Sequence, residues 1–231
     1  MRLLLTSNGI QNDVTRDALL GLLGKPFAES RIVVVLDAIL PFGGDKSMLL
    51  RNLESIRALG WAELDVMSLF AGPASRVESR LRSADVVLGY GGSNIWLAHA
   101  WQATGLDRML PELLHEKVYV GWSAGSMVFS HLHAAAVEAL EDDEPEVFEV
   151  ADVRPALGLF DWFVICHLGA DYFPHLTSEW AAERARRMNG PLWVLDDDSA
   201  LLVRNPDEEP EVVSSGHWLH FDATGTLVGS A

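Results

Sequence analysis

Cysteine is nearly absent from this chain of 231 residues: Cys166 is the only one, so no internal disulfide can form. A chain without disulfides is typical of a reducing compartment, and we therefore expect a cytoplasmic protein. Long apolar runs are absent as well, because no stretch reaches the roughly 18 apolar residues of a membrane span. The apolar run at residues 3–5 is too short for the core of a secretion signal and indicates a first β-strand.

Basic residues are scarce: 17 Lys and Arg stand against 33 Asp and Glu, which gives a formal net charge of -16. Such a surface repels nucleic acid phosphates and anionic lipids, so we expect neither nucleic acid nor membrane among the partners. Cofactor signatures are missing too, since no Gly-Lys-Ser/Thr occurs. His131 and His133, on a helix expected after Ser123, are two residues apart and would face different sides. The sequence thus predicts no metal and no organic cofactor.

What the sequence does contain is an alternation of apolar strands and helical patterns. Continuous β-branched runs, such as residues 31–36, are typical of strands buried on both faces. The expected strands are residues 3–6, 31–36, 62–69, 84–89 and 118–122, and the expected helices are residues 13–23, 47–59, 76–83 and 95–104. This order predicts an α/β fold with a doubly wound, mostly parallel sheet and helices on both faces.

The last third of the chain has a different pattern. Short strands are expected at residues 160–166, 191–195, 200–204, 211–214 and 217–221, a β-rich tail that would complete or edge the sheet. Residues 138–149 form an acidic, proline-interrupted stretch for which a solvated loop is the expected structure. No linker separates these parts, and we expect a single domain over residues 1–231.

The chain is organised around Gly121-Trp122-Ser123-Ala124-Gly125, which follows the apolar strand that begins at Val118. Strand, Gly-x-Ser-x-Gly and an apolar helix form the pattern of a nucleophile elbow, in which a sharp turn exposes the serine oxygen. Small neighbours allow the strand and the helix to approach without a clash. Free N–H groups at the start of the helix can stabilise a negatively charged oxygen. We therefore predict that Ser123 is a nucleophile.

A nucleophilic serine requires a base. Among the eight histidines, His167 follows the apolar run at residues 160–166, and so lies at the carboxyl edge where α/β sheets bind their ligands. We predict that His167 is the base. Cys166 would point to the opposite face of the strand and is expected to be a buried, inert thiol. His217 and His220 are expected to be structural or surface residues.

A second glycine turn, Gly89-Tyr90-Gly91-Gly92-Ser93-Asn94, also lies between a predicted strand and a predicted helix. Its spacing does not match a dinucleotide-binding fingerprint. A glycine turn beside the elbow can instead supply a main-chain N–H to an oxyanion.

Together these segments resemble the peptidase E family of aspartyl dipeptidases, which has cyanophycinase-like relatives and a fold similar to class I glutamine amidotransferases. The resemblance includes the opening Leu3-Leu4-Leu5-Thr6-Ser7-Asn8 and the late Leu195-Asp196-Asp197-Asp198-Ser199. It implies a serine peptidase for short, unblocked peptides, with Ser123 as nucleophile and His167 as base. It also implies an oxyanion hole built from the N–H groups of Gly92 and Ala124, with Gly91 and Ser93 beside the substrate.

For the third catalytic residue, the resemblance indicates Asp197 where the family usually has Glu, and it leaves Glu138 as an alternative. The family arginine that recognises a substrate aspartate would fall near Trp180, and the nearest arginines are Arg184 and Arg186. Aspartate specificity therefore depends on whether one of these arginines reaches the pocket. A homodimer is compatible with this interpretation.

Two other functions stay open from the sequence. An α/β-hydrolase-type esterase would order its residues as Ser123, Asp197 and His217. A catalytically inactive relative would only bind a small ligand or a partner protein.

Overall fold

The buried apolar runs form the central strands of the computed structural model, which describes residues 1–231. The strands are β1 (Leu3–Thr6), β2 (Arg31–Val35), β3 (Glu63–Met67), β4 (Val86–Gly89), β5 (Val118–Trp122), β6 (Phe163–Ile165), β7 (Leu192–Leu195), β8 (Ser199–Val203), β9 (Glu211–Ser214), β10 (Trp218–Phe221) and β11 (Leu227–Ser230). The α-helices are α1 (Asp13–Leu23), α2 (Ser47–Ala58), α3 (Ala74–Ser83), α4 (Asn94–Ala103), α5 (Leu110–Glu116), α6 (Ala124–Met127), α7 (His133–Leu140), α8 (Glu144–Val147) and α9 (Ser178–Met188). Two short 3-10 helices are η1 (Phe27–Glu29) and η2 (Leu106–Met109).

The main sheet has seven strands in the order β3-β2-β4-β5-β1-β8-β9. The first five pair in parallel, and β8 and β9 extend the sheet with antiparallel pairs. The predicted α/β fold with a mostly parallel sheet is confirmed. No helix is both long enough and apolar enough to cross a membrane.

Helices cover both faces of this sheet, and the side-chain period of the strands decides what each face contacts. In β1, Leu3 and Leu5 join the apolar cluster beneath α3, α4 and α5. Leu4, between them, joins the cluster beneath α1 and α2. Strands buried on both sides must be apolar at every position, which is why their sequences are continuous runs.

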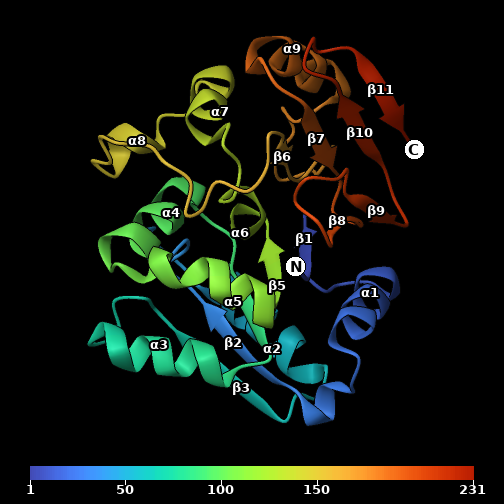
Figure 1. Cartoon of the computed structure of the whole chain (residues 1–231). Coiled ribbons are helices and arrows are strands. Elements are labelled where there is room, and N and C mark those ends of the chain that lie inside the picture. The colour runs from blue at the N-terminus through green and yellow to red at the C-terminus, as the bar shows by residue number, and fades with distance from the viewer.

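The β-rich tail differs from the expectation that it would only complete or edge the main sheet. β8 and β9 do extend that sheet, but β6, β7, β10 and β11 form a second sheet, in the order β11-β10-β7-β6. The second sheet lies beside α9 in the upper right of Figure 1. One of its faces packs against α7 and α9. Trp162, Val164 and Trp193 join the main core on the other side, so the second sheet is fixed against the first.

Three further expectations were wrong. The helix after Ser123 ends at Met127, so His131 lies outside any helix and His133 begins the separate helix α7. The acidic stretch is not a solvated loop throughout, because it includes the end of α7 and all of α8. The strand expected over residues 160–166 is limited to β6. The helices α5, α7 and α9 and the strand β11 were not predicted.

Candidate active site

Ser123 occupies the turn between β5 and α6 in a backbone conformation that few side chains adopt, with φ 52° and ψ −114°. The close approach of neighbouring segments explains the two glycines around it. A Cβ at Gly121 would lie 2.6 Å from the Ser126 main-chain nitrogen, and one at Gly125 would overlap the Gly89 carbonyl oxygen. Only glycine fits at these two positions. The packing therefore holds Ser123 in a conformation that a free chain would avoid.

His167 follows the end of β6 and also has a left-handed backbone, with φ 71°. Its main-chain N–H donates to Ser7 Oγ at 2.8 Å, so the end of β1 anchors the turn. The imidazole Nε2 lies 2.8 Å from Ser123 Oγ. The second sheet thus brings His167 to the serine of the first sheet. The sequence predicted that His167 follows a strand of the main sheet. It follows β6 of the second sheet instead.

Asp197 lies just after β7 and accepts the hydrogen bond of His167 Nδ1 at 2.6 Å on Oδ1. Ser7 Oγ donates to the same oxygen at 3.3 Å, and the Tyr172 hydroxyl donates to Oδ2. Burial alone would raise the pKa of this carboxyl group. The hydrogen bonds from His167, Tyr172 and Ser7 outweigh burial and lower the pKa of Asp197 below its usual value. The acid is therefore ionised at neutral pH and linked to Ser123 through one imidazole.

The other acid and base candidates lie elsewhere. Glu138 is exposed on α7. His217 is exposed; its main-chain N–H donates to Asp196 and its Nδ1 lies 3.1 Å from the carbonyl oxygen of Ala231. His220 stacks on Trp193, with ring centroids 3.7 Å apart. The esterase arrangement of Ser123, Asp197 and His217 is therefore not assembled.

His133 and Cys166 are buried and inert. His133 Nε2 lies 2.6 Å from the Asn94 side-chain oxygen, and burial lowers the pKa of His133 to about 4. Burial raises the pKa of Cys166 to about 12, so this thiol stays protonated at neutral pH. No group of three or more His, Cys, Asp or Glu side chains is arranged to hold a metal ion.

The glycine turn after β4 lies directly against the serine. A Cβ at Gly91 would lie 3.3 Å from the Cβ of Ser123, so a side chain there would crowd the serine. Gly92 has φ +130°, and a Cβ on it would overlap the carbonyl of Ala38. Ala124 is the first residue of α6, and its N–H therefore has no acceptor within the helix. The glycine turn thus lies against Ser123 on one side, and the first residue of α6 follows it on the other.

Ser93, which the resemblance placed beside the substrate, is fully buried. Its hydroxyl accepts the Trp96 N–H at 2.9 Å as the N-cap of α4 and donates to Glu144 at 2.5 Å. Burial raises the pKa of Glu144 to about 7. The hydroxyl therefore both accepts and donates a hydrogen bond within the protein. These bonds give Ser93 a structural role beside the glycine turn.

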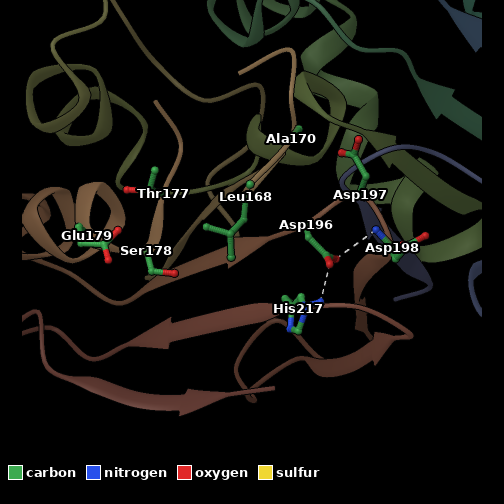
Figure 2. A pocket seen from close by; sticks show the side chains of 10 residues that line it. Leu168, Ala170, Thr177, Ser178, Glu179, Asp196, Asp197, Asp198 and His217 are labelled. Atoms are coloured by element: carbon green, nitrogen blue, oxygen red, sulfur yellow. Dashed lines mark hydrogen bonds between the residues drawn. The ribbon is translucent and has the colours of Figure 1, made fainter. Parts of the chain in front are cut away.

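A polar cavity of about 540 Å³ opens beside Asp197 (Figure 2). The Asp196 carboxylate accepts from the main-chain N–H groups of His217 and Asp198, whereas the Asp197 carboxylate points away from His217. The cavity is lined by Leu168, Gly169, Ala170, Thr177, Ser178, Glu179, Asp196, Asp197, Asp198 and His217. Four of these residues are acidic and none is Lys or Arg, so the cavity does not favour a negatively charged side chain.

None of the arginines of α9 lines this cavity. Arg184 donates to the Ala139 carbonyl at 3.1 Å and to Glu141 at 3.0 Å, and its guanidinium lies 5.5 Å from the centroid of the Trp180 ring. The backbone and Cγ of Arg186 pack against Gly225. The charge of Arg184 is thus used to join α9 to α7.

Sequence reasoning missed two residues of this site, Ser7 and Tyr172. Ser7 follows a buried strand at the carboxyl edge, a position that could have singled it out. Tyr172 lies in the irregular segment after β6, and no local pattern marks it.

Comparison with known proteins finds matches to peptidases. The model of peptidase family S51 matches residues 3–209. An uncharacterized peptidase of Listeria innocua serovar 6a is 28% identical over 148 residues, which are 64% of this chain and 66% of that protein, just under two thirds of its length. A second uncharacterized peptidase, from Listeria monocytogenes serovar 1/2a, is 25% identical over 158 residues, or 68% of this chain and 73% of that protein.

Two solved structures share the fold. A peptidase E candidate from Listeria monocytogenes EGD-e superposes with a TM-score of 0.71 and 18% identity, and the match covers 93% of this chain and 98% of the other. A peptidase from an acI-B1 Actinobacterium has a TM-score of 0.63 and 15% identity, with 100% and 96% covered. The expected resemblance to the peptidase E family is confirmed.

Proposed function

Because the chain belongs to peptidase family S51, we propose that this peptidase is of the serine type and hydrolyses short peptides as a dipeptidase or exopeptidase. The observation that carries this proposal is the continuous series of hydrogen bonds from Ser123 Oγ through the His167 imidazole to the Asp197 carboxylate, at 2.8 and 2.6 Å. A serine, a base and an orienting acid in this order are the requirements of acyl transfer.

In the proposed reaction, Ser123 Oγ attacks the carbonyl carbon of the scissile peptide bond while His167 Nε2 takes the hydroxyl proton. The tetrahedral intermediate collapses, the C–N bond breaks, and His167 returns the proton to the leaving amine. Water then attacks the acyl-enzyme with His167 again as base. The ester bond to Ser123 Oγ breaks, the carboxylic acid is released, and His167 returns a proton to Ser123. Asp197 holds the imidazole with Nδ1 protonated, so that Nε2 is free to accept the serine proton.

The negative charge of the intermediate requires nearby donors, and we assign this role to the N–H groups of Gly92 and Ala124. Each such donor contributes about 3–4 kcal/mol to transition-state stabilisation in serine hydrolases. The tight packing of Gly91 and Gly92 supports this assignment, because it holds the turn rigidly against Ser123.

The proposed substrates are short peptides with a neutral or cationic residue rather than aspartate. A buried substrate carboxylate without a charge partner would cost several kcal/mol, and Arg184 is already engaged by Glu141. The single cysteine is buried, which agrees with activity in a reducing cytoplasm.

The test is hydrolysis of a dipeptide library with Asp-X, Glu-X and neutral members by the wild type and by Ser123→Ala and His167→Ala. Both variants should lose at least about 10³-fold in kcat/KM, since residues of a triad act as a unit. His217→Ala is the matched control, and it should retain full activity. Full activity in Ser123→Ala would refute the serine mechanism, and loss of activity in His217→Ala alone would favour the esterase arrangement.

A further inference from the structure

Tyr172 contacts the acid–base pair but has no role in the reaction described above. It lies five residues after His167, in the segment between β6 and α9. Its hydroxyl donates to Asp197 Oδ2 and lies 3.0 Å from His167 Nδ1. The phenol oxygen therefore touches both members of the pair, opposite the side on which Ser123 meets the imidazole.

The surroundings of Asp197 show what this contact supplies. The Asp197 side chain is 28% exposed and lines the polar cavity beside it. A carboxylate in such a position would otherwise direct one oxygen to water and could rotate away from His167. Hydrogen bonds on both oxygens prevent this rotation, because Oδ1 is held by His167 and Oδ2 by Tyr172.

Packing alone does not account for Tyr172. Tyr172 is 57% exposed, and its ring meets that of His167 edge-on, with centroids 5.4 Å apart. Such an exposed ring gains little from burial, whereas its hydroxyl has two specific partners. Partial burial of the hydroxyl group, its hydrogen bond to Asp197 and the negative charge of that carboxylate raise the pKa of the Tyr172 phenol, so Tyr172 remains a donor across the range in which a peptidase operates.

We propose that Tyr172 is a positioning residue: its hydroxyl holds the Asp197 carboxylate in the orientation and ionisation state in which it orients His167. The consequence for catalysis depends on the proposed serine peptidase function. The effect of Tyr172 on the pair of His167 and Asp197 is independent of that function and can be measured without substrate.

In a hydrogen-bonded acid–base pair, the proton affinity of each group depends on the other. Removing one donor from the carboxylate makes the pair bind a proton more tightly and moves its titration to higher pH. The other titratable groups around the pair, which Tyr172→Phe leaves in place, are Cys166, Glu179, Asp196, Asp198 and His217.

The first measurement is an NMR titration of the ¹⁵N-labelled His167 imidazole, assigned by comparison with His167→Ala. Tyr172→Phe keeps the ring and should move the midpoint up by about half a unit to one unit. The matched control is Tyr90→Phe, which removes a hydroxyl that accepts from Asn52 at 2.7 Å, and it should leave the midpoint unchanged. An unchanged midpoint in Tyr172→Phe, or an equal shift in both variants, would overturn the proposal.

The second measurement is the rate of Ser123 labelling by a fluorophosphonate probe and of dipeptide hydrolysis. Tyr172→Phe should lose about tenfold in kcat with KM nearly unchanged, since the missing bond acts through the base rather than on the substrate. A loss confined to KM would overturn the positioning role. If the wild type neither labels nor hydrolyses peptides, the proposed function fails, while the NMR titration still decides the role of Tyr172.

Discussion

Replacement of Asp197 by Asn gives the sharpest test of the proposed chemistry, because the change removes a charge and keeps the shape. The carboxylate accepts three hydrogen bonds, from His167, Ser7 and Tyr172. An amide has one accepting oxygen and an NH2 group that only donates. If the NH2 group faces His167, Nδ1 must accept, the proton moves to Nε2, and the imidazole can no longer take the proton of Ser123.

If the amide oxygen faces His167 instead, the orientation survives, but the imidazolium formed in the reaction loses its ionic partner. In serine proteases the comparable change lowers kcat by about 10⁴. Because the Asp197 side chain is 28% exposed here, we expect a loss on the order of 10³ to 10⁴ in kcat/KM, or about 4 to 5.5 kcal/mol. The fold should persist, since the Tyr172 hydroxyl can rotate to accept from the amide.

The assay is kcat/KM on the best dipeptide found in the library, together with the rate of Ser123 labelling and the urea midpoint. Asp198→Asn is the matched control: it makes the same chemical change one residue away, at an exposed side chain that accepts from Asn12. It should keep activity within about threefold of the wild type, as expected of a surface substitution. Asp197→Asn activity within tenfold of the wild type, with the fold intact, would refute Asp197 as the catalytic acid.

Two further predictions concern the scaffold of the site. Gly125→Ala should destabilise the fold by about 2 kcal/mol or more, because its Cβ would overlap a main-chain carbonyl. Gly21→Ala on α1, where no atom lies within 4 Å, should be neutral or stabilising, and equal urea midpoints for the two variants would contradict this packing argument. For Glu144, the pKa is raised from its usual 4.5 to about 7, so its contribution to stability is present below pH 4.5 and is lost as the pH rises through about 7. Glu144→Gln should therefore remove part of the fall in urea midpoint between about pH 5 and about pH 8, while Glu146→Gln on the same helix should not. Identical pH profiles in both variants would count against an effect of partial burial on Glu144.

The central parallel strands and the turn at Ser123 could both be predicted from the sequence. The strands β1, β4 and β5 are buried at every residue, and β2 at every residue after Arg31. Such apolar runs have few alternatives to a parallel sheet, whereas the edge strand β3 is partly exposed. Local residues also determine where helix α1 begins and ends: Asn12 is its N-cap, and Gly24 follows it in the left-handed conformation. The turn at Ser123 depends on glycines four residues apart, which is again a local signal.

The end of the helix after Ser123, the second sheet and the catalytic acid depend on contacts between distant segments. The apolar residues after Met127 suggested a continuing helix, but Val128 and Phe129 are buried against the core and the chain turns away to form α7. Whether β6 and β7 join the main sheet or form a second one is a matter of pairing between distant segments, which periodicity does not specify. The choice of Asp197 over Glu138 depends on that pairing, because it places the end of β7 beside the end of β6.

Ser7 and Tyr172 illustrate the same limit at the level of single hydrogen bonds. Local sequence can indicate that a residue lies at a strand end or in a loop, since backbone preferences act over a few residues. It cannot indicate which distant oxygen a hydroxyl will meet, because a hydrogen bond requires an approach within about 3 Å. In this protein that approach exists only once the second sheet has packed against the first and has brought His167 and Asp197 to Ser123.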